Sequence, residues 1–414
     1  MALTSPFLMN VLQKIKQHTV FEALLILVLV TLPLGSYALN SCAIILFFLA
    51  SLYHFVTNKK HFYVNNISLL FISFYILCLF SLIWTEDIGN TQAGLIRFLS
   101  YLIIPLSFML SNSKQLNGHK IVGIFSKALV FYAVYCLLFA GINAFNNSDI
   151  GYFFYHKLSN NLGALNAIYL SVFVSLGVSF FLTKKNKSKL DLYSLFILSL
   201  FLILLSSKII ISVTFTTTLF YVIRKRKRIA TNLKSVLLIL GVLIIFIVAS
   251  SNLFKRVEVE VQKTKIHEVL NKENFGHVYL WTGFGLRIFQ VKAFVEISQE
   301  QEKIILGTGL NNSQTSLNNK YKEYNFYPGF LNYNYHNQYV QVFAELGFVG
   351  FCIFVFIFVL ILKEAIVNRN YFLASFIILL LVVCITESFL WRQRGMVFFI
   401  TISLLLTKKN KYTF

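Results

Sequence analysis

The chain has 414 residues, of which 57% are hydrophobic and only 13% are charged, and its mean hydropathy is +0.71. A water-soluble domain carries about 25% charged residues, so the composition excludes an ordinary soluble protein. The formal net charge is +21 at pH 7. Because the lysines and arginines lie in short connections between long apolar runs, this charge indicates membrane topology and not nucleic-acid binding.

Apolar runs of about 20 residues recur from end to end of the chain, and each is long enough to span a bilayer. They predict an all-α polytopic membrane protein of about twelve transmembrane helices, with one large periplasmic loop before the last three. An outer-membrane barrel would instead show short alternating segments. In chain order the predicted spans are 20–36, 38–56, 67–84, 95–111, 121–142, 164–183, 191–207, 209–223, 234–250, 338–362, 371–386 and 389–407.

Basic residues gather in every second connection, which predicts the orientation. With the N-terminus in the cytoplasm, all of these connections fall on the cytoplasmic side, and both termini are cytoplasmic. The basic residues of these connections are Lys59 and Lys60, Lys114 and Lys120, Lys184 to Lys189, Arg224 to Arg228, Lys363 and Arg369, and Lys408 to Lys411.

Three regions follow from this reading. Residues 1–250 form a transmembrane bundle of about nine spans, 251–337 form the large periplasmic loop, and 338–414 hold the last three spans and a basic tail. The loop has ten basic and eight acidic residues, a net charge of only +2. It is long enough for a small helical subdomain but not for a large independent core.

Within the large loop, Gly285–Ser298 is expected to be a short amphipathic helix with Ile288, Val291 and Val295 on its apolar face. The glycines of Gly307-Thr308-Gly309 favour a turn. The segment Asn311–Tyr335 is rich in Asn and Tyr, and we expect it to be irregular.

A concentration of polar side chains marks the junction between the large loop and the tenth predicted span. His336 lies just before the expected helix, and Gln338, Gln341 and Glu345 follow at spacings that place them on one helical face. Such groups can cap the free N–H groups of a helix entering lipid, which is the alternative to a chemical role.

Several other ionisable residues fall at the same predicted membrane face, with Arg97 just inside a span. Charged groups near lipid usually face partners or a wet cavity. Glu387 and Arg394 are seven residues apart, so we expect a structural ion pair between them. For Lys208, an interfacial lysine reaching toward water is the alternative to ligand binding. The residues at this face are His156, Lys157, Lys208, Arg287, His336, Glu387, Arg392 and Arg394.

This set of residues has chemical consequences. Arginine binds phosphate oxygens through two parallel hydrogen bonds, and lysine binds them as a point charge. A neutral histidine can take a proton from a sugar hydroxyl. No motif for a metal is present, so neither a metal nor another cofactor is expected. Together these features predict a metal-independent glycosyl transfer from a polyprenyl diphosphate sugar.

One set of motifs lies in and after the large loop: Arg287-Ile-Phe-Gln-Val-Lys-Ala, Leu306-Gly-Thr-Gly309, His336-Asn337-Gln338-Tyr339 and Glu345-Leu-Gly-Phe-Val-Gly350. In their order and predicted side of the membrane, these motifs resemble the O-antigen ligase/polymerase superfamily, and the resemblance covers roughly residues 60 to 405. Further stretches resemble the branch common in Bacteroidetes-type bacteria: Tyr155-His156-Lys157-Leu158-Ser159, Leu205-Ser206-Ser207-Lys208, and Thr386-Glu387-Ser388 followed by Arg392-Gln393-Arg394-Gly395. The resemblance implies a protein of the bacterial inner membrane.

The resemblance implies transfer of a glycan from undecaprenyl diphosphate to an acceptor at the periplasmic face. It maps the essential arginine and histidine of the family onto Arg287 and His336. Many members have Ser-Arg-Gly where this chain has Ser207-Lys208-Ile209, which keeps a cation but loses the guanidinium fork.

The roles expected from these arguments are therefore as follows. His336 is the general base, and Arg287 binds the diphosphate with help from Lys208 and Arg97. The further candidates for substrate binding are Gln338, Gln341, Glu345, His156 and Arg394. The expected partners are an undecaprenyl diphosphate-linked glycan donor, a lipid A-core or glycan acceptor, and membrane lipids.

Two alternatives to a ligase stay open from the sequence. A polymerase of O-antigen or exopolysaccharide units uses the same donor and differs only in its acceptor. A flippase or other transporter of lipid-linked oligosaccharides belongs to a different class, and would be expected to carry its polar groups near the middle of the membrane. Here the polar groups gather at one predicted face.

Overall fold

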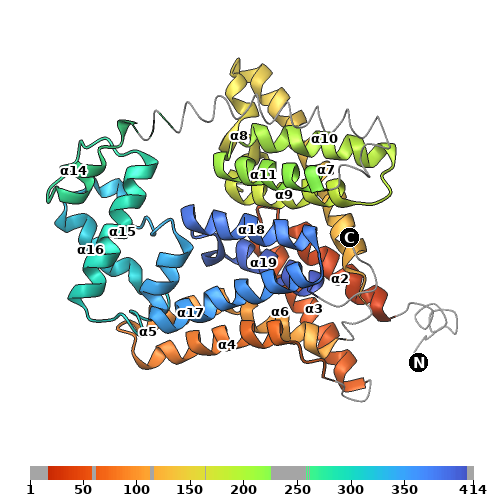
Figure 1. Cartoon of the computed structure of the whole chain (residues 1–414), viewed down its shortest axis with the longest axis horizontal. Helices are drawn as coiled ribbons and strands as arrows, with labels where there is room; N and C mark the ends of the chain where they lie inside the picture. The colour runs from red at the N-terminus through yellow and green to blue at the C-terminus, as the bar shows by residue number, and fades with distance from the viewer. Residues whose placement is uncertain are drawn as a thin grey trace, which may run out of the picture.

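The computed structural model describes residues 17–57, 62–111, 116–163, 165–224, 258, 260 and 262–407. Within these ranges every regular element is helical and there is no strand (Figure 1). The predicted span 234–250 lies outside the described residues, as do the basic residues at 59–60, 114, 225–228 and 408–411.

The first half of the chain forms a series of helices joined by short connections. Helix α4 continues into a short 3-10 helix, η1, and helices α5 and α6 meet at a break next to Leu99. The helices are α2 (Gln17–Thr31), α3 (Tyr37–Thr57), α4 (Asn66–Phe80), η1 (Ser81–Ile83), α5 (Ile88–Phe98), α6 (Ser100–Leu110), α7 (Gly118–Asn147), α8 (Tyr155–Ser159), α9 (Ala167–Thr183), α10 (Lys189–Leu204) and α11 (Lys208–Arg224).

The second half contains a small helical subdomain and then the last helices of the bundle. Figure 1 shows α14 (Ile266–Asn271), α15 (Gly283–Glu300) and α16 (Ser313–Glu323) grouped beyond one end of the other helices. The chain then returns through three long helices, with the 3-10 helix η6 before the last. They are α17 (Gln338–Val367), α18 (Tyr371–Thr386), η6 (Phe389–Trp391) and α19 (Gln393–Leu406).

By length and composition, five of the described helices could each cross a membrane, or six if the bent pair Tyr155–Leu162 and Ala167–Thr183 counts as one span. Each of the eleven predicted spans within the described residues overlaps a helix, but several of those helices are shorter than a full span. The chain is therefore an all-helical protein with several candidate membrane helices, and the number twelve stays a prediction.

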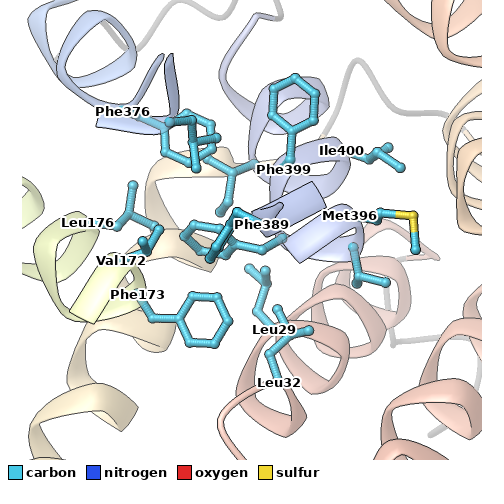
Figure 2. Packing of buried hydrophobic residues seen from close by; sticks show 14 of the residues in the cluster. Leu29, Leu32, Val172, Phe173, Leu176, Phe376, Phe389, Met396, Phe399 and Ile400 are labelled. Carbon is cyan, nitrogen blue, oxygen red and sulfur yellow. The ribbon is translucent and has the colours of Figure 1, made fainter. Parts of the chain in front are cut away.

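The bundle is organised around α9 and α19, which are buried along nearly their whole length. Figure 2 shows how Phe173 of α9, Phe376 of α18 and Phe399 of α19 converge with Phe389 of η6. Because these two helices have no face left for lipid, their apolar residues form an internal core. The remaining helices surround them and expose apolar side chains, as a membrane bundle does.

The connections predicted to face the periplasm lie at one end of the bundle, here called the loop end. There Asn311 Nδ2 donates to Asn90 O at 3.0 Å, and Lys208 Nζ lies 3.0 Å from Glu260 Oε2. At the opposite end, Lys120 Nζ lies 2.7 Å from Glu22 Oε2. The structure thus separates the two predicted sets of connections, and which set faces the periplasm stays a prediction.

Impermeant thiol labelling can test the orientation. In a variant without native cysteines, we expect a cysteine at exposed Asn319 in the subdomain to react in intact spheroplasts, and one at exposed Asn186 to react only after lysis. The reason is the basic residues beside Asn186, which favour the cytoplasm. If only the cysteine at position 186 reacts in intact spheroplasts, the orientation is reversed and the proposed chemistry would lie on the cytoplasmic side.

Two expectations for the large loop need correction. Part of the segment expected to be irregular, Asn311–Tyr335, is the helix α16. The helix expected over Gly285–Ser298 exists as α15, but Val291 and Val295 are exposed, and Phe289 and Ala293 are buried instead. The aromatic cluster of the subdomain covers the Phe289 face, with rings from Phe275, Trp281, Tyr321, Tyr324 and Phe326 around it.

A charged group is buried in this subdomain as well. Lys320 is only 5% exposed and contacts carboxylates of Glu296, Glu300 and Glu323. Burial alone would lower the pKa of Lys320, but hydrogen bonds from its ammonium to Glu300 and Glu323 raise that pKa above its ordinary value. These contacts join α15 to α16, so the subdomain that carries Arg287 has a fixed shape.

Helix α17 is broken at Gly347, which has φ 63° and ψ −165°. The expected turn around Gly307 packs against this break. Phe348 N donates to Ile304 O at 2.9 Å, while Thr308 N and Gly309 N donate to Ala344 O and Glu345 O at 3.0 and 2.9 Å. Peptide groups released by the break are thus paired again, and the subdomain is joined to the helix that follows His336.

Candidate functional site

The loop end brings Arg287 and His336 to the same carboxylate, that of Glu387 at the end of α18. Arg287 Nη2 donates to Glu387 Oε1 at 3.0 Å, and His336 Nδ1 lies 3.3 Å from Glu387 Oε2. The three side chains come from α15, the start of α17 and the end of α18. Each is partly exposed, at 32%, 30% and 21% respectively, so a ligand from solvent or the membrane surface can reach them.

Glu387 determines how the imidazole is used. A carboxylate accepts hydrogen bonds, so Nδ1 of His336 must carry the hydrogen that bonds it. In a neutral imidazole, Nε2 is then the proton acceptor, and no described residue forms a hydrogen bond with it. This leaves a ring nitrogen with basic character at the surface of the site.

The backbone around His336 is fixed by two asparagines. His336 has φ 45°, an unusual conformation for a residue other than glycine, and its N–H donates to Asn334 Oδ1 at 3.0 Å. The next residue, Asn337, caps α17 by accepting from Tyr339 N and Val340 N. The expectation that His336 precedes a helix is confirmed, and these caps explain how its side chain is directed.

Arg287 lies in the first turns of α15 and is held by three contacts. Besides Glu387, its Nε donates to Thr386 O and its Nη1 to Gly283 O, both at 3.0 Å. N–H groups on both terminal nitrogens remain for a ligand. Arg287 therefore presents a fixed guanidinium edge at the loop end.

Lys208 and His156 lie next to this group. Glu260 accepts from Lys208 Nζ at 3.0 Å and from Phe284 N at 3.1 Å, so it links Lys208 to the first turn of α15, the helix of Arg287. His156 accepts from Ala167 N at 3.3 Å, and the charge of Glu387 acts on its imidazole. The sequence-predicted residues Arg287, His336, Lys208 and His156 thus share one region.

Gln338, Gln341 and Glu345 lie on one face of α17, as their spacing predicted, but they are only 1–2% exposed and have partners within the protein. Gln338 Oε1 accepts from Leu390 N at 2.8 Å. Gln341 Nε2 donates to Glu345 Oε1 at 2.6 Å, and Trp391 Nε1 donates to the same oxygen at 3.1 Å. These side chains hold the 387–392 loop against α17, and in the described part of the chain no hydrogen bond or ion pair joins them to Arg287 or His336.

The expected ion pair between Glu387 and Arg394 is wrong. Glu387 ends α18 and Arg394 lies within α19, with η6 between them, so the two do not share a helical face. Arg394 is 6% exposed, and its Nη2 donates to Leu34 O at 2.9 Å and to Gly35 O at 2.8 Å. Arg394 thus fixes the turn between α2 and α3. Glu387 instead contacts Arg287 and His336.

Arg97 packs on Trp391, with its Cζ 4.0 Å from the centroid of that ring. Sequence reasoning missed the parts played by Trp391, Glu260 and Glu387. A signal existed for Glu387, which follows a long apolar run directly and belongs to one of the quoted motifs.

The fold and this site define a helical membrane protein with an arginine, a carboxylate and a histidine joined at one end of its helices. Residues 192–355 match a family model described as O-antigen ligase. The match confirms the resemblance to the O-antigen ligase superfamily, a family of enzymes. It covers Lys208, Arg287 and His336 and ends before Glu387. No curated protein matches the chain.

Proposed function

We propose that this chain is a glycosyltransferase of the O-antigen ligase type, acting at the periplasmic face of the bacterial inner membrane. It moves a glycan from undecaprenyl diphosphate to a hydroxyl of the lipid A-core. The observation that carries the proposal is the Glu387 carboxylate, which contacts both the guanidinium of Arg287 and the imidazole of His336. The family match, which covers Arg287 and His336, supports the class of reaction.

The base in this reaction is His336. Its Nδ1 donates to Glu387, so its Nε2 takes the proton of the acceptor hydroxyl as the oxygen attacks the anomeric carbon. The carbon–oxygen bond to the diphosphate breaks, and its electron pair leaves with the diphosphate. A direct displacement of this kind inverts the anomeric centre.

Arg287 and Lys208 bind the departing diphosphate. Both lie at the start of helices, α15 and α11, where the helix dipole favours an anion. Glu260 contacts Lys208 and the first turn of α15, which brings the two cations to one region of the site. Since cations meet the charge of the leaving group, the reaction as proposed needs no metal ion.

Glu387 and the residues beneath the site position the reacting groups. Glu387 orients the ring of His336 through Nδ1. Gln338, Gln341 and Glu345 act through Trp391 and Leu390, which they hold in the 387–392 loop. We assign them a positioning role, and assign His156 to the wall of the site.

Deletion of the gene tests the function and its acceptor. We expect cells without this protein to keep full-length glycan chains on the undecaprenyl carrier and to lack them on lipid A-core, as seen by gel analysis of both fractions. Single repeat units on the core would identify a polymerase instead. Loss of surface polysaccharide, with lipid-linked glycan trapped on the cytoplasmic side, would indicate a transporter and contradict both enzymes.

A further inference from the structure

A second pair of cations lies at the other end of the 387–392 loop. The guanidinium carbons of Arg97 and Arg392 lie 4.0 and 5.3 Å from the centroid of the Trp391 ring. In the described part of the chain, neither guanidinium forms an ion pair or donates a hydrogen bond, and Nη1 of Arg97 is buried without a partner. A guanidinium stays protonated, so two positive charges without an ion-pair partner in the described residues lie at one indole ring.

The buried carboxylate of Glu345 forms no ion pair with either arginine among the described residues. It accepts instead from Gln341, Ser313 and the indole N–H of Trp391. The N–H of the indole is thereby held by Glu345, while the two guanidinium groups lie against the indole ring. Attraction to a ring face offsets part of the cost of burying a guanidinium, but it does not supply acceptors for the N–H groups.

Such an arrangement favours a phosphate group as the missing partner. Both guanidinium groups lie against one indole ring, and an anion bound to both would offset the repulsion between their like charges. The planar fork of arginine matches phosphate oxygens. Arg392 is exposed, so the pair can be reached from outside the bundle, and Arg97 lies deeper, at the break between α5 and α6.

We propose that Arg97 and Arg392, fixed around Trp391, form a second anion site that binds a phosphate group of the acceptor lipid. This inference rests on the proposed function, in which the donor diphosphate occupies Arg287 and Lys208. One loop carries both sites, because Glu387 at its start contacts His336, and Trp391 and Arg392 lie at its end. Binding of the acceptor at the second site would bring its hydroxyl toward His336.

Direct binding tests the site without requiring transfer. The protein in nanodiscs of zwitterionic lipid is titrated with dihexanoyl phosphatidic acid and, separately, with inorganic phosphate, with tryptophan emission as the signal and Trp391→Phe as its control. We expect saturable binding that weakens at least about tenfold in Arg97→Gln and Arg392→Gln, since each loses hydrogen bonds to a charged group. Binding of phosphatidic acid alone would assign the site to lipid headgroups, and equal binding of both would assign it to any phosphate.

Lys157→Gln is the matched control, because it removes one cation from the same end of the bundle at a residue paired with Asp149. The inference is wrong if Lys157→Gln weakens binding as much as Arg392→Gln, or if neither arginine variant changes it. Removal of an exposed or unpartnered charge should not impair folding, and Arg97→Lys, which keeps the charge, should bind with intermediate strength.

Kinetics separates this inference from the proposed function. In a transfer assay, Arg97→Gln and Arg392→Gln should raise the KM for the acceptor about tenfold while kcat and the KM for the donor stay unchanged. A rise in the donor KM instead would place both arginines in the donor site and overturn the inference. If the wild-type protein transfers nothing, the proposed function fails, and the titration still decides whether the anion site exists.

Discussion

Replacing His336 with alanine should lower the turnover of bound donor by about 10²–10⁴-fold, the usual loss when a general base is removed. Donor binding should change little, because Arg287 and Lys208 lie on other helices and remain in place. Purified wild-type and variant protein are compared for equilibrium binding of the lipid-linked donor and for transfer rate at saturating donor. Normal turnover combined with weak donor binding would make the histidine a substrate ligand and not the base.

His336→Gln and Glu387→Gln refine this test. Glutamine at 336 can form hydrogen bonds but cannot take up the proton, so activity should stay lost. Glutamine at 387 removes the charge that contacts both His336 and Arg287, and we expect reduced turnover with a shifted pH profile. A variant at 336 that recovers full activity would contradict general-base catalysis. Size-exclusion profiles must match the wild type, because misfolding would mimic loss of chemistry.

Arg287→Lys gives the contrasting result at the same site. Lysine keeps the charge but cannot reproduce the contacts to Thr386 O, Gly283 O and Glu387 together. We therefore expect weaker donor binding along with slower transfer, whereas His336→Ala affects transfer alone. Identical profiles for the two variants would mean that the residues do not have the separate roles proposed here.

Replacing Gly347 with alanine should destabilise the whole loop end. The backbone at Gly347, with φ 63° and ψ −165°, belongs to a region that only glycine adopts readily, and strain alone costs about 1–3 kcal/mol. A methyl group there would also collide with the backbone at Ile305. The 304–309 turn would have to leave the break in α17, so we expect a lower midpoint in thermal unfolding and reduced transfer.

Gly276→Ala is the control for this substitution. Gly276 also has a positive φ, +69°, but a Cβ there meets nothing within 4 Å. It shares the positive φ but not the collision, so its unfolding midpoint should fall less than that of Gly347→Ala. Equal shifts for the two variants would show that the packing of the turn against α17 contributes nothing to stability.

The sequence by itself determined the membrane class and the places of most helices, and it singled out Arg287 and His336, which contact one carboxylate in the candidate site. Long apolar runs must fold as helices in lipid because backbone groups there have no other partner. Basic residues also gather in every second connection between these runs, which predicts the orientation. Residues such as Arg287 and His336 could be singled out because ionisable groups are rare in so apolar a chain.

The partners of these residues were decided by the tertiary structure. Seven-residue spacing suggested that Glu387 pairs with Arg394, but η6 interrupts the helix and turns the two side chains apart. Likewise, the helical face of Gln338, Gln341 and Glu345 was predicted correctly, while its burial against Trp391 and Leu390 was not visible in the sequence.

The physical reason is the sequence separation of the residues that interact. Helix formation and membrane insertion depend on neighbours within a few turns, so a local pattern predicts them. The contacts of Glu387 with Arg287 and His336 join residues separated by 100 and 51 positions in the chain. Such contacts form only when the subdomain packs against α17 at Gly347 and Glu345 holds the 387–392 loop. Neither packing contact can be predicted from a local sequence pattern.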